Sequence, residues 1–307
     1  MRVAVTGAGG RLGQALVAAL AESPLSGIGG PIAWTREQFD LDHPDRFAPL
    51  LARDRPEVVV HCAAWTDVDG CARDPDLAMA RNATATSALA HACATSGADL
   101  VVVSTNEVFD GRRTDGRGYS PDDEPAPNNA YGTSKLAAER LAADAMTASA
   151  PPRGRRGSSL AIVRTSWLFG PPGSDFPGRI LAAAEKASAA GERMKLVADE
   201  IGSPTYTLDL ADAIVELIAE APTGIHHVVN AGTVSRADWA REVFRLANVR
   251  VDTEDVPAST WKRDSTPPPW AVLEPTSLPS GEPLRPWQQA LADHVPSLLR
   301  QRSGAGR

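Results

Sequence analysis

The stretch that decides the fold is "RVAVTGAGGRLGQALVAALAES", residues 2–23. It joins a short apolar strand to an amphipathic helix through a glycine-rich turn with a GxxGxxG arrangement. Glycines there allow a tight bend, and a pyrophosphate can bind the free N–H groups at the start of the helix. We predict a nucleotide-binding turn, with packing alone as the alternative explanation. Its residues are Gly7, Ala8, Gly9, Gly10, Arg11, Leu12 and Gly13.

The chain then repeats the alternation of strand and helix. The β-branched runs "PEVVVHCAA" (56–64), "DLVVVST" (99–105) and "LAIVRTSW" (160–167) are separated by segments rich in Ala and Leu. Strands that are apolar on both faces are typical of a parallel sheet covered by helices on each side. The pattern predicts an α/β fold with a doubly wound parallel sheet of the Rossmann type.

Beyond residue 170 the pattern is less regular. Residues 203–221 and 224–232 predict one more helix and one more strand, whereas 265–287 hold too many prolines for a helix or a central strand. The polar segment 111–130, rich in Gly and Pro, predicts a long loop beside a site.

This organisation predicts two domains. We expect a cofactor-binding Rossmann domain from residues 1–169 and 206–231, and a smaller, discontinuous substrate-binding domain from 170–205 and 232–307. Within them, "ASAPPRGRRGSS" (148–159) has the composition of a flexible surface insertion, and "RSGAGR" (302–307) that of a frayed tail.

Composition excludes several classes of protein. With 307 residues, 43% hydrophobic and 22% charged, the chain is typical of a globular protein, and a net charge of -7 argues against nucleic-acid binding. The three cysteines lack CxxC spacing, and no carboxylate or histidine cluster requires a metal. Without a leader-like segment or a run of about 18 apolar residues, we expect a cytoplasmic protein that does not bind membranes.

The end of the second strand indicates which dinucleotide binds. NAD-preferring sites usually carry an acid there, but "PIAWTREQFDL" (31–41) offers Thr35 and Arg36, so a 2′-phosphate would meet a cation. NADPH is therefore favoured, NADH stays an alternative, and Arg36 as a plain surface charge is the other explanation. Further cofactor contacts are expected from Asp40, Leu41, Ala63 and Ala64.

A tyrosine and a lysine follow the predicted loop. Tyr131 and Lys135 are four residues apart in "YGTSK", so a helix would place phenol and ammonium on one face. Burial beside a cation favours the phenolate, which predicts a lowered tyrosine pKa and proton exchange near neutral pH. The alternative is an ordinary helix surface. Thr105, at the end of a predicted strand, lies 26 residues earlier.

Six motifs carry a family resemblance. They are "VTGAGGRLGQAL", "VVVHCAAWTDVD", "STNEVFDG", "NAYGTSKLAAE", "RTSWLFG" and "DEIGSPTYTLDLADAI". In this order, and nearly end to end, the chain resembles extended short-chain dehydrogenases/reductases, most closely the dTDP-4-dehydrorhamnose reductase family. The resemblance implies NADPH-dependent reduction of the 4-keto group of a nucleotide-activated 6-deoxyhexose.

The resemblance also implies roles for individual residues. Thr105, Tyr131 and Lys135 would form the catalytic set, with Tyr131 protonating the ketone oxygen and Lys135 binding the nicotinamide ribose. Trp167 would pack against the deoxysugar, with core packing as the alternative. The partner would be a nucleotide sugar, and a homodimer is possible. The implied substrate contacts are Thr66, Asp67, Val68, Asn106, Glu107 and Trp167.

The turn after Thr105 departs from the family. Reductases usually have Ser-Thr-Asp-Tyr there and 4,6-dehydratases Thr-Asp-Glu, whereas this chain has Thr105-Asn106-Glu107. Asparagine cannot deliver a proton to a leaving hydroxide, which disfavours dehydration and leaves reduction intact. The substitution points to an altered sugar or nucleotide carrier. A dehydratase or epimerase with a recycled cofactor, and a non-catalytic regulatory subunit of the methionine adenosyltransferase type, are the alternative functions.

Overall fold

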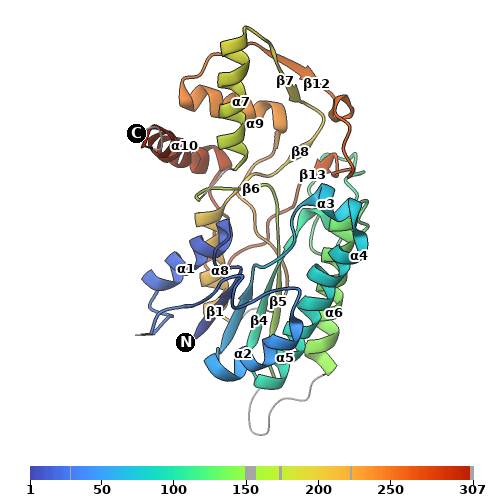
Figure 1. Ribbon diagram of the computed structural model, residues 1–307, viewed down its shortest axis with the longest axis vertical. Helices are drawn as coiled ribbons and strands as arrows, with labels where there is room; N and C mark the ends of the chain where they lie inside the picture. The colour runs from blue at the N-terminus through green and yellow to red at the C-terminus, as the bar shows by residue number, and fades with distance from the viewer. Residues whose placement is uncertain (28, 149–156, 173–174, 222, 305–307) are drawn as a thin grey trace.

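The computed structural model describes residues 1–27, 29–148, 157–172, 175–221 and 223–304 (Figure 1). Its centre is a six-stranded parallel sheet in the order β10-β5-β4-β3-β1-β2. The predicted doubly wound α/β fold is therefore confirmed. The strands are β1 (Val3–Thr6), β2 (Ile32–Trp34), β3 (Val58–His61), β4 (Asp99–Thr105), β5 (Leu160–Thr165) and β10 (Gly224–His227).

Alternate residues of the central strands supply two cores. Val3 and Val5 of β1 pack into the core beneath α1 (Arg11–Glu22) and α8 (Thr207–Ala219), while Ala4 packs into the opposite core. That opposite core is covered by α2 (Phe47–Asp54), α5 (Ala85–Ser96) and α6 (Ala130–Ala148). Figure 1 shows α1 and α8 on one side of the sheet and α5 and α6 on the other. Burial on both faces is why these strands are continuously apolar.

Short elements connect the sheet to its helices. Most lie beside the carboxyl ends of the strands, and one of them, η2, has π-helical hydrogen bonding. Residues 111–129 carry no helix or extended strand, as predicted, and a bridge from Tyr119 to Leu273 is one of the contacts that join this loop to the rest. The connecting elements are η1 (Pro44–Arg46), α3 (Val68–Arg73), α4 (Pro75–Ala78), η2 (Met79–Thr84) and η3 (Asn106–Val108).

A second group of elements lies beyond the carboxyl ends of the sheet (Figure 1). Helices α7 (Phe176–Ala190), α9 (Arg236–Ala247) and α10 (Trp287–Gly304) enclose a separate core around Trp239 and Leu291. Small sheets of two or three strands accompany them. Their strands and turn are β6 (Leu168–Phe169), β7 (Met194–Val197), β8 (Ile201–Gly202), β9 (Thr205–Tyr206), β11 (Val234–Ser235), β12 (Thr253–Val256), η4 (Ala258–Thr260) and β13 (Trp270–Ala271).

The helix and strand expected after residue 203 are confirmed as α8 and β10. Helices α7, α9 and α10 were not predicted, and residues 302–304 are helical rather than frayed. Most of the insertion 148–159 and the last three residues lie outside the described part. The division into two domains at residues 170, 206 and 232 stays a proposal. Within the described ranges, no helix combines the length and apolar character that crossing a bilayer requires.

Buried hydrogen bonds join the glycine turn to the neighbouring loop. Thr6 Oγ1 lies 2.8 Å from His61 Nδ1 and accepts from the backbone N–H groups of Cys62 and Ala63 at 3.1 Å. Burial lowers the pKa of His61 to about 3, so the imidazole is neutral. The ends of β1 and β3 are therefore held in one position without a buried charge.

The glycine turn is also held by a close approach within itself. A Cβ added to Gly13 would lie 2.2 Å from the carbonyl oxygen of Gly7, so only glycine fits at this position in the first turn of α1. We expect Gly13→Ala to lower the free energy of unfolding by about 1–3 kcal/mol through this steric clash. Urea denaturation measures the effect.

Gly9→Ala is the matched control, because a Cβ at Gly9 meets nothing within 4 Å. Its stability should stay within about 0.5 kcal/mol of the parent protein. Equal losses in the two variants would contradict the steric explanation.

Candidate active site

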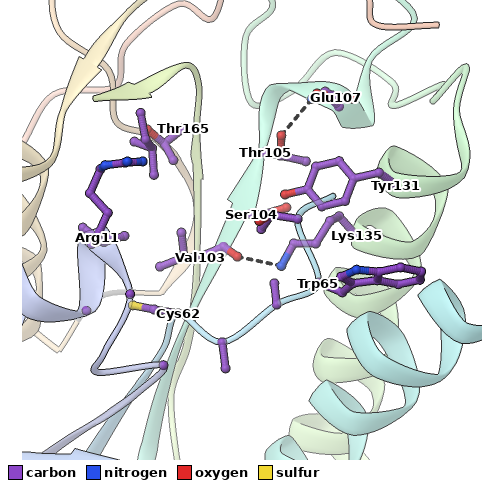
Figure 2. Close-up of a pocket in the computed structure, with 18 of the residues that line it drawn as sticks. Arg11, Cys62, Trp65, Val103, Ser104, Thr105, Glu107, Tyr131, Lys135 and Thr165 are labelled. Atoms are coloured by element: carbon purple, nitrogen blue, oxygen red, sulfur yellow. Dashed lines mark hydrogen bonds between the residues drawn. The ribbon is translucent and has the colours of Figure 1, made fainter. Parts of the chain in front are cut away.

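A cavity of about 620 Å³ opens at the carboxyl edge of the parallel sheet, and Figure 2 shows its catalytic end. Every predicted site residue lines it except Ala8, Gly9 and Asp67. Parallel strands bring such residues together because their carboxyl ends meet at one edge of the sheet. The lining residues that sequence analysis missed are Phe39, Cys62, Trp65, Arg81, Val103, Ser104, Thr165, Ser166, Leu168 and Arg236.

One end of the cavity has the features of a dinucleotide phosphate site. Gly10 caps α1 without a side-chain hydrogen bond, and the first turn of α1 contains no acidic residue. Space above Gly9 is open, and Arg11 lines the cavity while its Nε donates to the carbonyl of Gly170 at 2.8 Å. The helix N-terminus and this cation therefore fit a pyrophosphate.

The adenine end carries two cations. Arg36 is exposed and lines the cavity, as predicted for contact with a 2′-phosphate. Arg81 of η2 lines it too, forms two 2.6 Å hydrogen bonds to Asp42, and lies 5.4 Å from the ring centroid of Trp65. Sequence analysis gave no signal for Arg81. This residue lies in η2, several helical turns before the next strand, β4, and so not beside a strand end. The two guanidinium groups fit a phosphorylated ribose.

Tyr131 and Lys135 lie on the cavity side of α6, next to the end of β4 (Figure 2). The Nζ of Lys135 donates to the carbonyl oxygen of Val103 at 2.8 Å. Burial lowers the pKa of Lys135 to about 8, although the charge of Glu139 opposes the shift. Tyr131 and Lys135 therefore lie on a buried face of α6 that presents both groups to the cavity, and not on an ordinary exposed helix surface.

The predicted lowering of the tyrosine pKa is wrong for the protein without bound ligands. Burial raises the pKa of Tyr131, the charge of Glu107 raises it further, and only a hydrogen bond with Thr105 lowers it. The ammonium of Lys135 hydrogen-bonds to Val103 and is not among the charges that act on the phenol. Tyr131 is therefore protonated near neutral pH, the state required of a proton donor.

Glu107 has a fixed position in the cavity. Its Oε2 accepts from Asn129 Nδ2 at 2.8 Å, and its backbone N–H donates to Thr105 Oγ1 at 3.2 Å. Burial raises the pKa of Glu107, while the hydrogen bond from Asn129 and the charge of Arg236 act in the opposite direction. Asn106 is buried beside it, with its Oδ1 3.4 Å from Thr105 Oγ1.

The start of α6 packs directly on this turn. A Cβ at Gly132 would lie 2.0 Å from the carbonyl oxygen of Glu107, so glycine is required at the position after Tyr131. The N–H of Gly132 also donates to Asn129 Oδ1 at 2.8 Å. Glu107 and Tyr131 are therefore held in contact through backbone packing and through one shared asparagine.

The sugar end of the cavity is formed with the second group of elements. Trp167 lines it with a left-handed φ of 45°, and the guanidinium of Arg236 lies 3.5 Å from its ring centroid. The ring of Trp239 stacks on that of Trp167 with 5.7 Å between the ring centroids. Much of the Trp167 indole is therefore used for packing, as the alternative explanation stated. Arg236 is the first residue of α9 and lies 3.5 Å from Glu200. The N-cap pattern of Ser235 with Asp238 was the signal that could have located this arginine.

The segment after β3 places two of its three predicted residues in the cavity. Thr66 and Val68 line the cavity, but Asp67 does not. Its Oδ1 instead accepts from the N–H of Gly70 at 2.9 Å and so caps α3. Asp67 also lies 3.5 Å from Arg73, and its role is local because a cap must point back along its own helix. Among the described residues, no group of three or more His, Cys, Asp or Glu side chains is arranged to hold a metal ion.

The parallel sheet, the glycine turn and the Thr-Tyr-Lys set define an oxidoreductase of the extended short-chain dehydrogenase/reductase class. The chain belongs to the RmlD substrate binding domain family, whose sequence profile matches residues 1–300. The resemblance seen in the sequence motifs is thereby confirmed.

Relatives of known name agree with this assignment. A dTDP-4-dehydrorhamnose reductase of Mycobacterium tuberculosis is 36% identical over 298 residues, which cover 95% of this chain and 91% of the relative. A dTDP-4-keto-6-deoxy-D-glucose reductase of Streptomyces niveus is 34% identical, with 96% of each chain covered. The crystal structure of a dTDP-4-dehydrorhamnose reductase from Bacillus anthracis in complex with NADP superposes with a TM-score of 0.85 at 30% identity, covering 96% of this chain and 99% of that one.

A buried ion pair joins α6, the helix that carries Tyr131 and Lys135, to the central sheet. Arg164 of β5 donates to Glu139 of α6 at 2.7 Å, with both side chains at most 3% exposed, and Ser104 also donates to Glu139. We expect Glu139→Gln to lower the free energy of unfolding by about 3–5 kcal/mol, because the buried charge of Arg164 loses its partner. Chemical denaturation measures the loss.

Glu242→Gln is the control. Its partner Arg245 lies at 2.6 Å and is exposed, while Glu242 is partly exposed, so solvent screens the charges and the change in stability should be far smaller. A similar effect from the two substitutions would contradict the importance of burial.

Proposed function

We propose that the protein reduces the 4-keto group of a nucleotide-activated 6-deoxyhexose with NADPH, and that dTDP-4-dehydrorhamnose is a substrate. The observation that carries the proposal is a buried, protonated Tyr131 beside Thr105, in a cavity whose other end fits a phosphorylated dinucleotide. The 36% identity to reductases of that name supports the choice of sugar.

NADPH would bind along the carboxyl edge of the sheet and supply the hydride for reduction. The turn from Gly7 to Gly13 would hold the pyrophosphate, with Arg11 close by, and Arg36 and Arg81 would hold the 2′-phosphate. The expected contacts to adenine and ribose stay a proposal, which assigns them to Asp40, Leu41, Ala63 and Ala64.

The side chains at the end of the cavity away from the glycine turn would transfer the proton to the ketone oxygen. Thr105 and Tyr131 would donate hydrogen bonds to the ketone oxygen, and Tyr131 would pass its proton to that oxygen as charge develops there. Lys135, whose pKa of about 8 keeps it largely protonated near neutral pH, would stabilise the phenolate that is left and bind the ribose. The burial that raises the pKa of the free phenol also makes this neighbouring cation effective.

The substrate contacts follow from the lining of the sugar end. Thr66, Val68, Asn106 and Glu107 are the proposed sugar contacts, with Trp167 at the edge of the cavity. Dehydration is the weaker function because Asn106 offers no proton. A purely regulatory role is weaker still because it does not require a buried proton donor. A cytoplasmic location and a homodimer stay predictions.

Consumption of NADPH with dTDP-4-dehydrorhamnose, followed by nicotinamide absorbance, tests the proposed reaction. Tyr131→Phe should lower kcat by about 10²–10⁴-fold, because the ketone oxygen loses its proton donor. Tyr119→Phe is the matched control: that hydroxyl donates to Asp110 outside the cavity, so activity should stay within about threefold. The proposal fails if the parent protein oxidises no NADPH with this or a related ketosugar.

The cofactor preference has its own test. Arg36→Ala should raise KM for NADPH at least about tenfold and leave KM for NADH nearly unchanged, since one charged hydrogen bond contributes about 1.5–3 kcal/mol. Steady-state kinetics with each cofactor measures the difference. Arg46→Ala, at an exposed arginine on η1 outside the cavity, should change neither constant. An equal effect of Arg36→Ala on KM for both cofactors would mean that Arg36 is a plain surface charge that does not contact the 2′-phosphate.

A further inference from the structure

Glu107 is a carboxyl group that takes no part in the proton transfer of ketone reduction. The proton of that reaction comes from Tyr131, yet Glu107 lines the same cavity and its charge acts on the Tyr131 phenol. Asn129 fixes its carboxyl at 2.8 Å, and Gly132 allows its backbone to lie against the start of α6. A rigid, half-buried carboxyl group thus stands beside the group that polarises the ketone.

A polarised ketone has a second reactive position. Hydrogen bonds to the carbonyl oxygen make the hydrogens on the neighbouring carbons more acidic, because the enolate that forms is stabilised at the same oxygen. A carboxylate in a desolvated site is a suitable base for such a hydrogen. Thr105, Tyr131 and Glu107 provide these elements in one cavity.

We propose that Glu107 is a second proton-transfer group, which removes a proton from a carbon next to the ketone, so that the protein also catalyses hydrogen exchange between that carbon and solvent. This activity rests on the proposed function only in using the same ketosugar. It makes Glu107 a catalytic residue in its own right.

The step balances without an oxidant or a reductant. The C–H bond breaks, its proton forms an O–H bond on Glu107, and its electron pair becomes the C=C bond of an enol. The carbonyl oxygen takes the proton of Tyr131, and Lys135 lies one helical turn away to stabilise the resulting phenolate. Exchange of the Glu107 proton with water and reversal of the step return a solvent hydron to the carbon.

The charged surroundings of Glu107 allow it to serve as the base. Burial raises its pKa above the ordinary 4.5, which makes the carboxylate more basic than an exposed one. The hydrogen bond from Asn129 and the charge of Arg236 act in the opposite direction and favour the ionised carboxylate. The charged or titratable groups that act on it come from helices α3, α6 and α9 and from two loops, and are Cys71, Tyr131, Arg236, Arg263 and Glu200.

The experiment uses the full chain with NADP⁺, which cannot reduce the ketone, and dTDP-4-dehydrorhamnose in D₂O. Mass spectrometry and proton NMR follow deuterium entering the carbons next to the ketone. We expect exchange at least about 100-fold above a blank without protein. With Glu107→Gln, deuterium exchange should fall to the level of the blank.

Glu124→Gln is the control, because that carboxylate is 87% exposed on the loop before α6. It should retain both activities. If the parent protein reduces the ketone but catalyses no deuterium exchange, this inference is overturned and the proposed function stands. If the parent protein shows neither reduction nor exchange, the inference and the proposed function are both overturned. Exchange by Glu107→Gln at the parent rate also overturns the inference.

The pH profile of exchange is an independent measurement that does not require a variant to fold. The base is the ionised carboxylate, so the exchange rate of the parent protein should rise with pH through a pKa above 4.5, the ordinary value for glutamate. A rate that is independent of pH across this range would overturn the assignment of Glu107 as the base.

Discussion

The ion pair between Arg164 and Glu139 is the interaction on which the site depends. It joins β5 to α6 in a place that water does not reach, and Ser104 of β4 completes it. Two charges buried together are tolerated only when each satisfies the other, so the helix has one position relative to the sheet. Tyr131 and Lys135 take their places at the cavity from that position. The positions of the two reactive side chains at the cavity therefore depend on an ion pair buried in the interior.

The fold could be predicted wherever burial left a simple pattern in the chain. Strands such as Val58–His61 are covered on both faces, so the first three residues are all valine and the run stands out. Helices α7 and α10 gave no comparable signal. Pro177 lies in the first turn of α7 and Pro296 lies inside α10, and both helices bury only one side against a small core. A proline in a first turn is compatible with a helix, but it obscures the periodicity on which sequence analysis relies.

For the site, the motif residues could be predicted, but their surroundings could not. The glycine turn and the Thr-Tyr-Lys set are local patterns, whereas Arg236 reaches the cavity from a separate core and Asp67 turns back to cap its own helix. The sign of the tyrosine pKa shift was wrong for a related reason. Spacing along a helix shows that an ammonium is near, but it does not show that Val103 already binds that ammonium or that Glu107 stands on the other side of the phenol.

The missing side chain at Gly132 limits how this pocket can diverge. Because the carbonyl of Glu107 occupies the space of a Cβ, the acid-bearing turn and the tyrosine helix behave as one rigid body. Neither can be shifted to suit a different sugar without moving the other. Adaptation to new substrates is thereby directed to the opposite wall, where Trp167 and Arg236 belong to separate elements that do not pack on this turn through Gly132. Relatives that act on different sugars would then differ mainly along that wall.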